Sequence, residues 1–192
     1  MEPALISPSI ERVGNALKLA VDTEDEYHSC VYELAPKNGL SWTIIVDAEP
    51  TEIFGCGITT IMGPATCASP TEREGETIFL WSNGNAWTVG FTDRNLPNCV
   101  GFGRGDVLKC ILMPDNFSVL LNEEPYFSTR TFNGRKLSLW QWRPIILLAG
   151  LGMRVTVDCS PVPASVLADY TSLSKPCHAQ VFELGACTCR AT

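Results

Sequence analysis

Two histidines, His28 and His178, are the only imidazoles available to act as a general base in this chain. A Ser-His-Asp or Cys-His arrangement must use one of them to activate its nucleophile. Neither lies in a recognisable nucleophile or base motif, so a solvated or hydrogen-bonded imidazole is the simpler interpretation. The acidic run at residues 22–26 is typical of a solvated loop. The sequence therefore predicts no catalytic residues, and we expect the protein not to be an enzyme.

The cysteines are the second group of chemically capable side chains. There are nine, an odd number, and most lie among apolar neighbours, as Cys56 and Cys110 do, where a free thiol behaves as a small buried hydrophobe. We expect reduced thiols rather than a disulfide scaffold, which is typical of small secreted chains. Four potential zinc ligands lie in the C-terminal tail: Cys177, His178, Cys187 and Cys189. Their spacing matches no common zinc finger, so we expect neither a metal nor another cofactor.

Two short motifs are better explained by backbone geometry than by chemistry. Arg104-Gly105-Asp106 spells an adhesive tripeptide, but Gly105 and Asp106 are the residue types expected in a turn that opens a strand. The glycines at 101, 103 and 105 lack the lysine and the following helix that a phosphate-binding loop requires. We therefore expect neither integrin-type adhesion nor nucleotide binding here.

The segment Trp140-Gln141-Trp142-Arg143 is the most suggestive for binding. Alternation along a strand points Trp140 and Trp142 to one face and Arg143 to the other. Core packing and exposure at a binding surface are equal alternatives for the two indoles. An exposed indole beside Arg143 would be a natural hot spot, because Trp and Arg dominate interface energetics.

Composition limits the function classes. The chain has 192 residues, 45% of them hydrophobic, which suffices for one domain with a proper core. Its net charge of -7 repels a phosphate backbone on average, so we expect no nucleic-acid partner. No window approaches the ~18–20 apolar residues of a membrane-spanning helix, and the start at Met1 shows no secretory signal. We expect a cytoplasmic protein, with the nucleus as the alternative.

Short segments rich in Val, Ile, Phe, Trp and Thr follow one another along the chain, each bounded by Gly, Pro, Asn or Asp. They predict strands at 16–21, 29–34, 40–48, 53–59, 77–82, 86–91, 106–113, 117–122, 136–139, 145–149 and 153–158. Alternation is clearest where Phe117, Val119 and Leu121 share one face and where Met153, Val155 and Val157 do. With no helix between them, such strands predict an all-β fold, an antiparallel two-sheet β-sandwich.

The predicted sandwich occupies residues 13–160. Residues 1–12 are expected to be a leader, and residues 161–192 a short helical or irregular C-terminal extension that packs on the sandwich or trails from it. Two helical turns are expected near Pro163. The longest loop runs over residues 60–76, and a loop of that length is usually functional or disordered.

The segment from Gly103 to Glu123 resembles the hallmark hairpin of SPRY (B30.2-like) domains, in which a Gly-Asp-Val turn opens a strand and a second strand ends near Asn122. Other pieces fall in the family's order: Leu40–Val46, Phe54–Ile58, Trp81–Trp87 and Arg143–Val157. Here Asn122-Glu123 replaces the usual Asn-Gly.

This resemblance implies a concanavalin-like jelly roll with a non-enzymatic role as an adaptor or scaffold component. Loops at one edge of the sandwich would bind a peptide or protein partner, as loops on a rigid scaffold commonly do. The residues expected to bind the partner are Met62, Arg94, Asn95, Trp140, Trp142, Arg143, Gly150 and Leu151.

A lectin-like carbohydrate-binding sandwich is the alternative. The segment Trp81-Ser-Asn-Gly-Asn-Ala-Trp87 offers two indoles that could stack on sugar rings. Against it, the paired His, Asn, Arg and Glu set of galectins is not found, and calcium ligands of the legume type are not evident.

Overall fold

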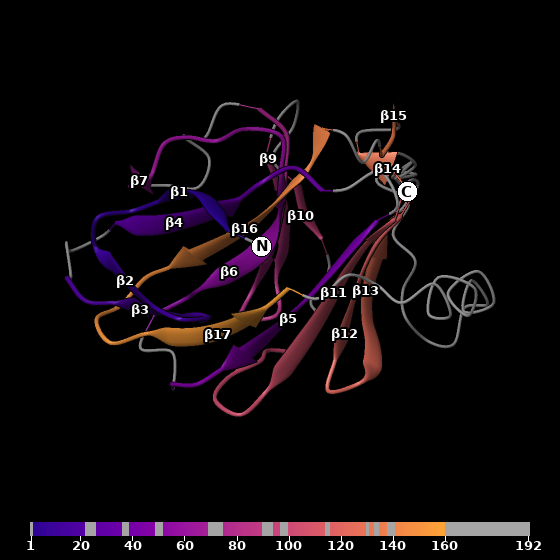
Figure 1. Cartoon of the computed structure of the whole chain (residues 1–192). Coiled ribbons are helices and arrows are strands. Elements are labelled where there is room, and N and C mark those ends of the chain that lie inside the picture. Colours follow the sequence, from indigo (N-terminus) through magenta and orange to yellow (C-terminus); the bar gives the residue numbers. More distant parts are fainter. Residues whose placement is uncertain are drawn as a thin grey trace, which may run out of the picture.

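The structure is a computed structural model in which two antiparallel sheets pack against each other (Figure 1). It describes residues 2–21, 26–35, 39–48, 52–68, 75–89, 94–96, 100–113, 116–129, 131–132, 135–137 and 141–159. The described residues form strands, turns and loops, and the expectation of an antiparallel β-sandwich is confirmed. The helical turns expected near Pro163, like the whole C-terminal extension, lie outside the described residues.

The first sheet contains eight strands among the described residues. In hydrogen-bonding order they are β1 (Pro3–Ile6), β4 (Tyr27–Tyr32), β16 (Arg143–Leu148), β6 (Gly55–Thr59), β8 (Thr77–Trp81), β9 (Ala86–Val89) and β10 (Arg94–Leu96), with β7 (Thr66–Cys67) paired to β4. Strands distant in sequence therefore lie side by side, and the late strand β16 lies between β4 and β6.

The second sheet contains seven strands in the described part of the chain. In order they are β13 (Glu124–Thr129), β12 (Asn116–Leu121), β11 (Val107–Met113), β5 (Leu40–Val46), β17 (Arg154–Asp158), β3 (Ala16–Leu19) and β2 (Ile10–Val13). The strands β14 (Thr131–Phe132) and β15 (Arg135–Lys136) form a separate short pair.

The core lies between the two sheets. The alternation expected from the sequence is confirmed: Phe117 and Val119 are at most 1% exposed, and so are Met153 and Val155. Trp42 of β5 stacks on Phe117 with ring centroids 6.0 Å apart and an interplanar angle of 12°. Such offset aromatic pairs add to the stabilisation from burial alone.

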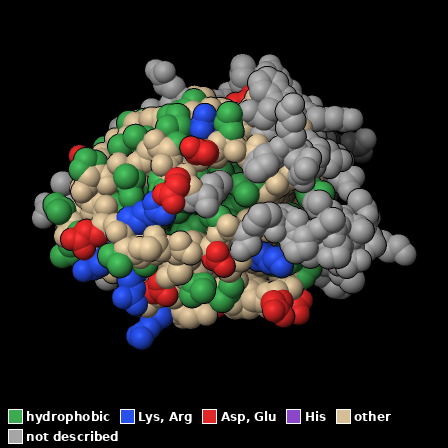
Figure 2. Space-filling model, in the orientation of Figure 1, with side chains coloured by type: hydrophobic (Ala, Val, Ile, Leu, Met, Phe, Trp, Pro, Cys, Tyr) green, Lys and Arg blue, Asp and Glu red, His purple; other side chains and the backbone are tan. Residues whose placement is uncertain are grey.

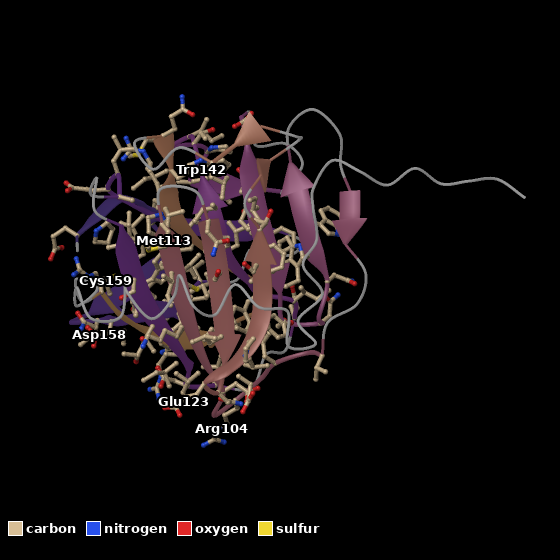
Figure 3. The ribbon with its side chains drawn as sticks, turned by 90° about the vertical axis from the view of Figure 1, so that its right-hand side faces the viewer. Arg104, Met113, Glu123, Trp142, Asp158 and Cys159 are labelled. Atoms are coloured by element: carbon tan, nitrogen blue, oxygen red, sulfur yellow. The ribbon has the colours of Figure 1, made fainter. Side chains whose placement is uncertain are left out.

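The hairpin that carries the family resemblance is formed by β11 and β12, with Leu108 opposite Leu121. Asp106 closes its open end: the Gly103 amide donates to Asp106 Oδ2 at 2.8 Å, and Asn122 Nδ2 donates to Asp106 Oδ1 at 2.7 Å. Figure 3 shows Arg104 and Glu123 at this end of the molecule. Both carboxylate oxygens of Asp106 therefore take part in the turn, which is the role that the sequence predicted for this residue type.

One sequence expectation differs from the structure at the start of the chain. The expected leader contains β1, which pairs with β4, and β2, which pairs with β3. Both strands have only four residues and lie at sheet edges. Such short segments show too little alternation to be distinguished from loop by sequence.

Strand β13 was also absent from the predicted strands. It contains Pro125, which cannot donate to a sheet ladder and is therefore tolerated at edges and bulges. In the structure β13 is an edge strand, and its register with β12 shifts between Val119 and Leu120, opposite Pro125. The proline therefore marks an irregular edge strand rather than the absence of one.

Candidate functional site

The eight-stranded sheet is apolar on its outer face as well as on its core face. Along β4, Cys30 and Tyr32 belong to the core between the sheets, whereas Val31 belongs to a second cluster on the other side. We call this second group the outer cluster; its buried members are Val31, Phe79, Trp81, Ile145 and Leu147, and its partly buried members are Leu5, Tyr27, Met62 and Trp87. On a sheet face that is exposed to water, the outward-facing side chains are usually polar. This face instead carries its own apolar layer.

The register of the strands sets the outer cluster in rows. Leu147, Gly55 and Trp81 follow one another across β16, β6 and β8. Gly55 has no side chain, so the Trp81 indole lies directly over it: a Cβ added at Gly55 would be 2.8 Å from Trp81 Cε3 and Cζ3. The absence of a side chain at Gly55 therefore leaves the space that the Trp81 indole occupies, and we call this place the seat of the indole.

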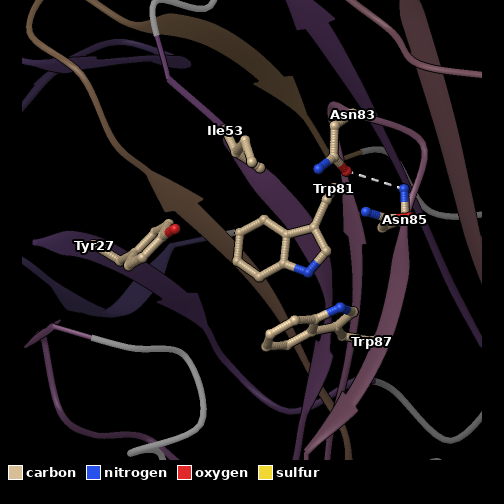
Figure 4. A pocket seen from close by; sticks show the side chains of 6 residues that line it. All are labelled: Tyr27, Ile53, Trp81, Asn83, Asn85 and Trp87. Atoms are coloured by element: carbon tan, nitrogen blue, oxygen red, sulfur yellow. Dashed lines mark hydrogen bonds between the residues drawn. The ribbon is translucent and has the colours of Figure 1, made fainter. Parts of the chain in front are cut away.

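A pocket of about 90 Å³ opens over this seat. It is lined by Tyr27, Ile53, Trp81, Asn83, Asn85 and Trp87 (Figure 4). The Tyr27 and Trp81 ring centroids are 5.6 Å apart with an interplanar angle of 61°. Those of Trp81 and Trp87 are 6.2 Å apart at 85°. Trp81, 4% exposed, forms the floor, and two steeply inclined rings stand beside it.

The turn between β8 and β9 fixes the polar side of the pocket. The Trp81 amide donates to the Asn85 carbonyl at 2.8 Å, and the Gly84 amide donates to the Trp81 carbonyl at 2.9 Å. Gly84 has φ of 86°, a conformation that glycine adopts without strain. The Asn85 amide donates to Asn83 Oδ1 at 3.1 Å, as Figure 4 shows. Both asparagines are therefore held at the pocket by backbone contacts.

Two polar groups of the pocket are in unusual environments. Burial raises the pKa of the Tyr27 phenol, and the negative charge of Glu52 raises this pKa further. The Trp81 Nε1 atom is buried and has no hydrogen-bond partner among the described residues. Figure 4 shows this nitrogen on the edge of the indole nearest Trp87. The negative charge of Glu52 thus acts on Tyr27, which lines the pocket.

The loop after β6 is anchored to β4, at the same end of the sheet as Tyr27. The Ser29 amide donates to the Ala65 carbonyl at 2.7 Å, and Ser29 Oγ donates to the Pro64 carbonyl at 3.3 Å. The peptide bond before Pro64 is cis. Met62 of this loop packs on the outer cluster. The described part of the expected loop thus packs, through Met62, against the outer cluster that also carries the pocket.

A serine–histidine contact lies beneath this loop. Ser7 Oγ is 3.0 Å from His28 Nδ1 and 3.3 Å from Thr66 Oγ1. Both Ser7 and His28 are 1% exposed. A nucleophile must reach its substrate, so this buried contact serves to tie β1, β4 and β7 together.

Some of the residues expected to bind a partner lie near the pocket. Met62 belongs to the outer cluster. Arg94 and Asn95 lie on β10, where Asn95 is the backbone partner of Trp87. Their side chains and the whole of Trp140 lie outside what the structure describes.

The other expected residues do not form one surface. Trp142 is 1% exposed and belongs to the core (Figure 3), so core packing is the correct alternative for this indole. Arg143 begins β16, whereas Gly150 and Leu151 form the turn after its other end. A six-residue strand spans ~17 Å, which separates Arg143 from Leu151. Leu151 is 55% exposed and remains available for contact.

Other ligand chemistries find little support in the described residues. These residues contain no group of three or more His, Cys, Asp or Glu side chains placed to hold a metal ion. The four potential zinc ligands of the tail lie outside them. On the face in Figure 2, Lys and Arg side chains lie among Asp and Glu side chains rather than in a continuous basic stripe. No helix in the described ranges is long and apolar enough to cross a membrane.

The pocket joins residues from three distant parts of the chain. The sequence singled out Trp81, Asn83, Asn85 and Trp87 as one segment, but it gave no signal for Tyr27 or Ile53. Tyr27 reaches the pocket because β4, β16, β6 and β8 are neighbours. This strand order cannot be read from local patterns.

No family model and no curated protein sequence matches this chain. Solved structures do match its fold. A human SPRY domain is 15% identical, with 78% of this chain and 94% of that one covered and a TM-score of 0.59. The SPRY domain of human HERC1 is 13% identical, with coverage of 82% and 99% and a TM-score of 0.59. The carbohydrate recognition domain of Emp46p is 11% identical, with coverage of 80% and 87% and a TM-score of 0.50.

Proposed function

We propose, from the SPRY fold that these neighbours show and the sequence resemblance predicts, that this chain is a non-enzymatic protein-interaction module. It acts as an adaptor or scaffold component and binds a peptide or protein partner at the pocket of the eight-stranded sheet. The rigid sandwich fixes the pocket, and the adjoining turns and loops supply the rim.

The observation that carries this proposal is the composition of the pocket. Two tryptophans and a tyrosine line one small concavity, with Ile53 40% exposed beside them. Trp and Tyr are the residue types enriched at the energetic centres of protein interfaces. An apolar concavity with a few fixed polar groups is also the usual form of a binding site. A partner side chain inserted between Tyr27 and Trp87 would be surrounded by aromatic surface.

Carbohydrate binding is the second candidate function. It is favoured by Asn83 and Asn85, which place side-chain amides beside the indoles of the pocket, and by the fold shared with the Emp46p domain. A sugar ring stacks on a broad exposed aromatic face, whereas Trp81 is only 4% exposed. Protein binding therefore remains the first candidate. Binding to a glycan array through Trp87, without any protein partner, would reverse this order.

We also propose a reducing compartment, the cytoplasm or alternatively the nucleus. The described cysteines are all free: Cys30, Cys56, Cys67, Cys110 and Cys159. Disulfides form and persist in oxidising compartments. Thiol titration of the purified, denatured protein without reductant should therefore find all nine thiols. Recovery of a single thiol would indicate four disulfides and an oxidising compartment.

Site-specific photocrosslinking tests the proposed function. A photoreactive amino acid replaces Ile53 at the pocket, and in a matched control it replaces Val13, which is 78% exposed on the edge strand β2 of the other sheet. Irradiation in cells of the native organism should join the Ile53 variant to a defined protein. Crosslinking of the same protein with equal yield at Val13, or of no protein at Ile53, would contradict the proposal.

A further inference from the structure

The aromatic rings that line the pocket are steeply inclined to one another. Its floor is the Trp81 indole, seated on Gly55, and the rings of Tyr27 and Trp87 stand beside it at 61° and 85°. Three aromatic rings of different orientation therefore line one volume of about 90 Å³. A flat ligand would stack on one ring only. A compact, roughly spherical group would contact all three.

The electrostatics of the pocket favour a ligand with a positive charge. The face of each aromatic ring carries the negative part of its quadrupole and attracts cations. Among the described residues, those that line the pocket include neither Lys nor Arg. Glu52 directly precedes Ile53 at the rim, and its negative charge acts on Tyr27. The net charge of the chain, -7, adds a weak attraction of the same sign.

The apolar lining selects among cations. A primary ammonium group needs hydrogen-bond acceptors for its three N–H groups, whereas four of the six residues that line the pocket are aromatic or aliphatic. A methylated ammonium group needs fewer acceptors or none, and its methyl groups benefit from apolar contact. Aromatic cages of this kind recognise quaternary ammonium ligands.

A proline-rich peptide suits the pocket less well. Recognition of such peptides uses an aromatic-lined groove and a donor for the peptide carbonyl. The Trp81 N–H is buried on the ring edge nearest Trp87 (Figure 4), so it is not exposed to a peptide carbonyl. The pocket therefore suits the terminal group of a partner's side chain better than an extended peptide backbone.

We propose that the pocket formed by Tyr27, Trp81 and Trp87 binds the methylated ammonium group of a lysine side chain on a protein partner. This inference rests on the proposed function, which supplies the protein partner, and it names the chemical group that anchors it. The methylated ammonium sits between the rings of Tyr27 and Trp87, above the small exposed part of Trp81, and Glu52 balances its charge from the rim.

The test compares two probes with the full chain of 192 residues. One probe is Nα-acetyl-trimethyllysine amide. The other is its neutral analogue, in which carbon replaces the ammonium nitrogen, so that shape and methyl groups are kept while the charge is lost. Titration calorimetry should find binding of the cation and at least about tenfold weaker binding of the neutral analogue, since desolvated cation–π contacts reach that size. Equal binding of both probes, or no binding of the cation, would overturn the proposal.

Variants locate the binding. Trp87→Ala should weaken binding of the cation at least about tenfold. Glu52→Gln should weaken it by a few-fold at low salt and less at high salt, because the charge is at the rim. Trp87→Phe keeps a ring and should lose less than Trp87→Ala, which separates loss of the π face from loss of folding. Unchanged affinity in a folded Trp87→Ala protein would place the cation elsewhere and overturn the proposal.

Two further experiments distinguish a lipid ligand from a protein ligand, and this inference from the proposed function. Pocket-dependent binding to phosphatidylcholine vesicles, with no binding of the lysine probe, would assign the same chemistry to a lipid and overturn the protein source. The photocrosslink at Ile53 is read independently. A crosslinked partner that binds equally well after its lysines lose their methyl groups would leave the proposed function standing and remove this inference alone.

Discussion

At the scale of single residues, the turn between β12 and β13 carries strain that one substitution should relieve. Asn122 and Glu123 have φ of 51° and 71°, the left-handed region. Asn tolerates this region, whereas a residue such as Glu is disfavoured there by roughly 1–2 kcal/mol. Glu123 is exposed, so Glu123→Gly should raise the free energy of unfolding by about 0.5–1 kcal/mol, measured by urea denaturation.

The neighbouring position gives the control. Asn122→Gly also relieves the backbone, but it removes the hydrogen bond from Asn122 Nδ2 to Asp106 and the one that Asn122 Oδ1 accepts from the Val107 amide. It should therefore give no gain. A Glu123→Gly protein that is no more stable than wild type would mean that strain at this turn is not significant.

The residue scale also sets the limit of sequence-based prediction for the site. Trp81 and Trp87 could be identified as ligand-facing candidates because two indoles flank a turn. Tyr27 could not, because its place beside Trp81 depends on strand order. Arg143 and Leu151 were expected at one edge, but the two residues lie at opposite ends of β16. Strand β16 runs between them, so the two residues do not share one edge of the sheet.

At the scale of elements, β1 tests whether the start of the chain belongs to the domain. Leu5 and Ile6 pair with Val31 and Cys30 of β4, and they pack on the outer cluster and on the core, respectively. Deletion of residues 1–6 should lower the free energy of unfolding by about 2 kcal/mol or more, since two partly buried apolar side chains and a strand ladder are lost. Urea denaturation measures this.

Deletion of residues 1–2 is the matched control. Among the described contacts it removes the exposed ion pair between Glu2 and Arg12, and exposed pairs contribute about 0–1 kcal/mol. If the six-residue and two-residue deletions were equally stable, residues 3–6 would be the loose leader that the sequence suggested.

The elements that sequence could predict are those with strong alternation or long apolar runs. The segments around β5, β11, β12 and β17 were predicted closely because their inward positions are all apolar. Edge strands were missed because they are short, as β1 and β2 are, or carry proline, as β13 does. An edge strand has a neighbour on one side only and packs fewer apolar side chains, so its sequence shows a weaker apolar pattern.

At the scale of the whole molecule, buried thiol and phenol groups should make stability depend on alkaline pH. Burial raises the pKa of Cys30 from its ordinary 9.0 to about 12, and burial also raises the pKa of Tyr32. Above pH 9 the unfolded chain releases these protons while the folded chain retains them, so the free energy of unfolding falls as the pH rises toward 12. For Cys30 alone the loss between pH 8 and pH 10 is about 1 kcal/mol.

Denaturant titrations at pH 8 and pH 10 measure this dependence. Cys30→Ala removes the thiol and should reduce the loss by about the amount assigned to Cys30. The same decrease in wild type and in Cys30→Ala would show that Cys30 does not hold its proton in the folded state.

The proposed binding of a protein partner depends on the aromatic pocket on the outer face of the eight-stranded sheet. The most direct measurement is the dissociation constant of the crosslinked partner for wild type, Trp87→Ala and Val13→Ala, each first shown to have an unchanged melting temperature. Trp87→Ala should weaken binding at least about thirtyfold, the effect of losing an aromatic anchor of about 2 kcal/mol. Val13→Ala should bind like wild type. A folded Trp87→Ala protein that binds the partner within twofold of wild type would contradict partner binding at this pocket.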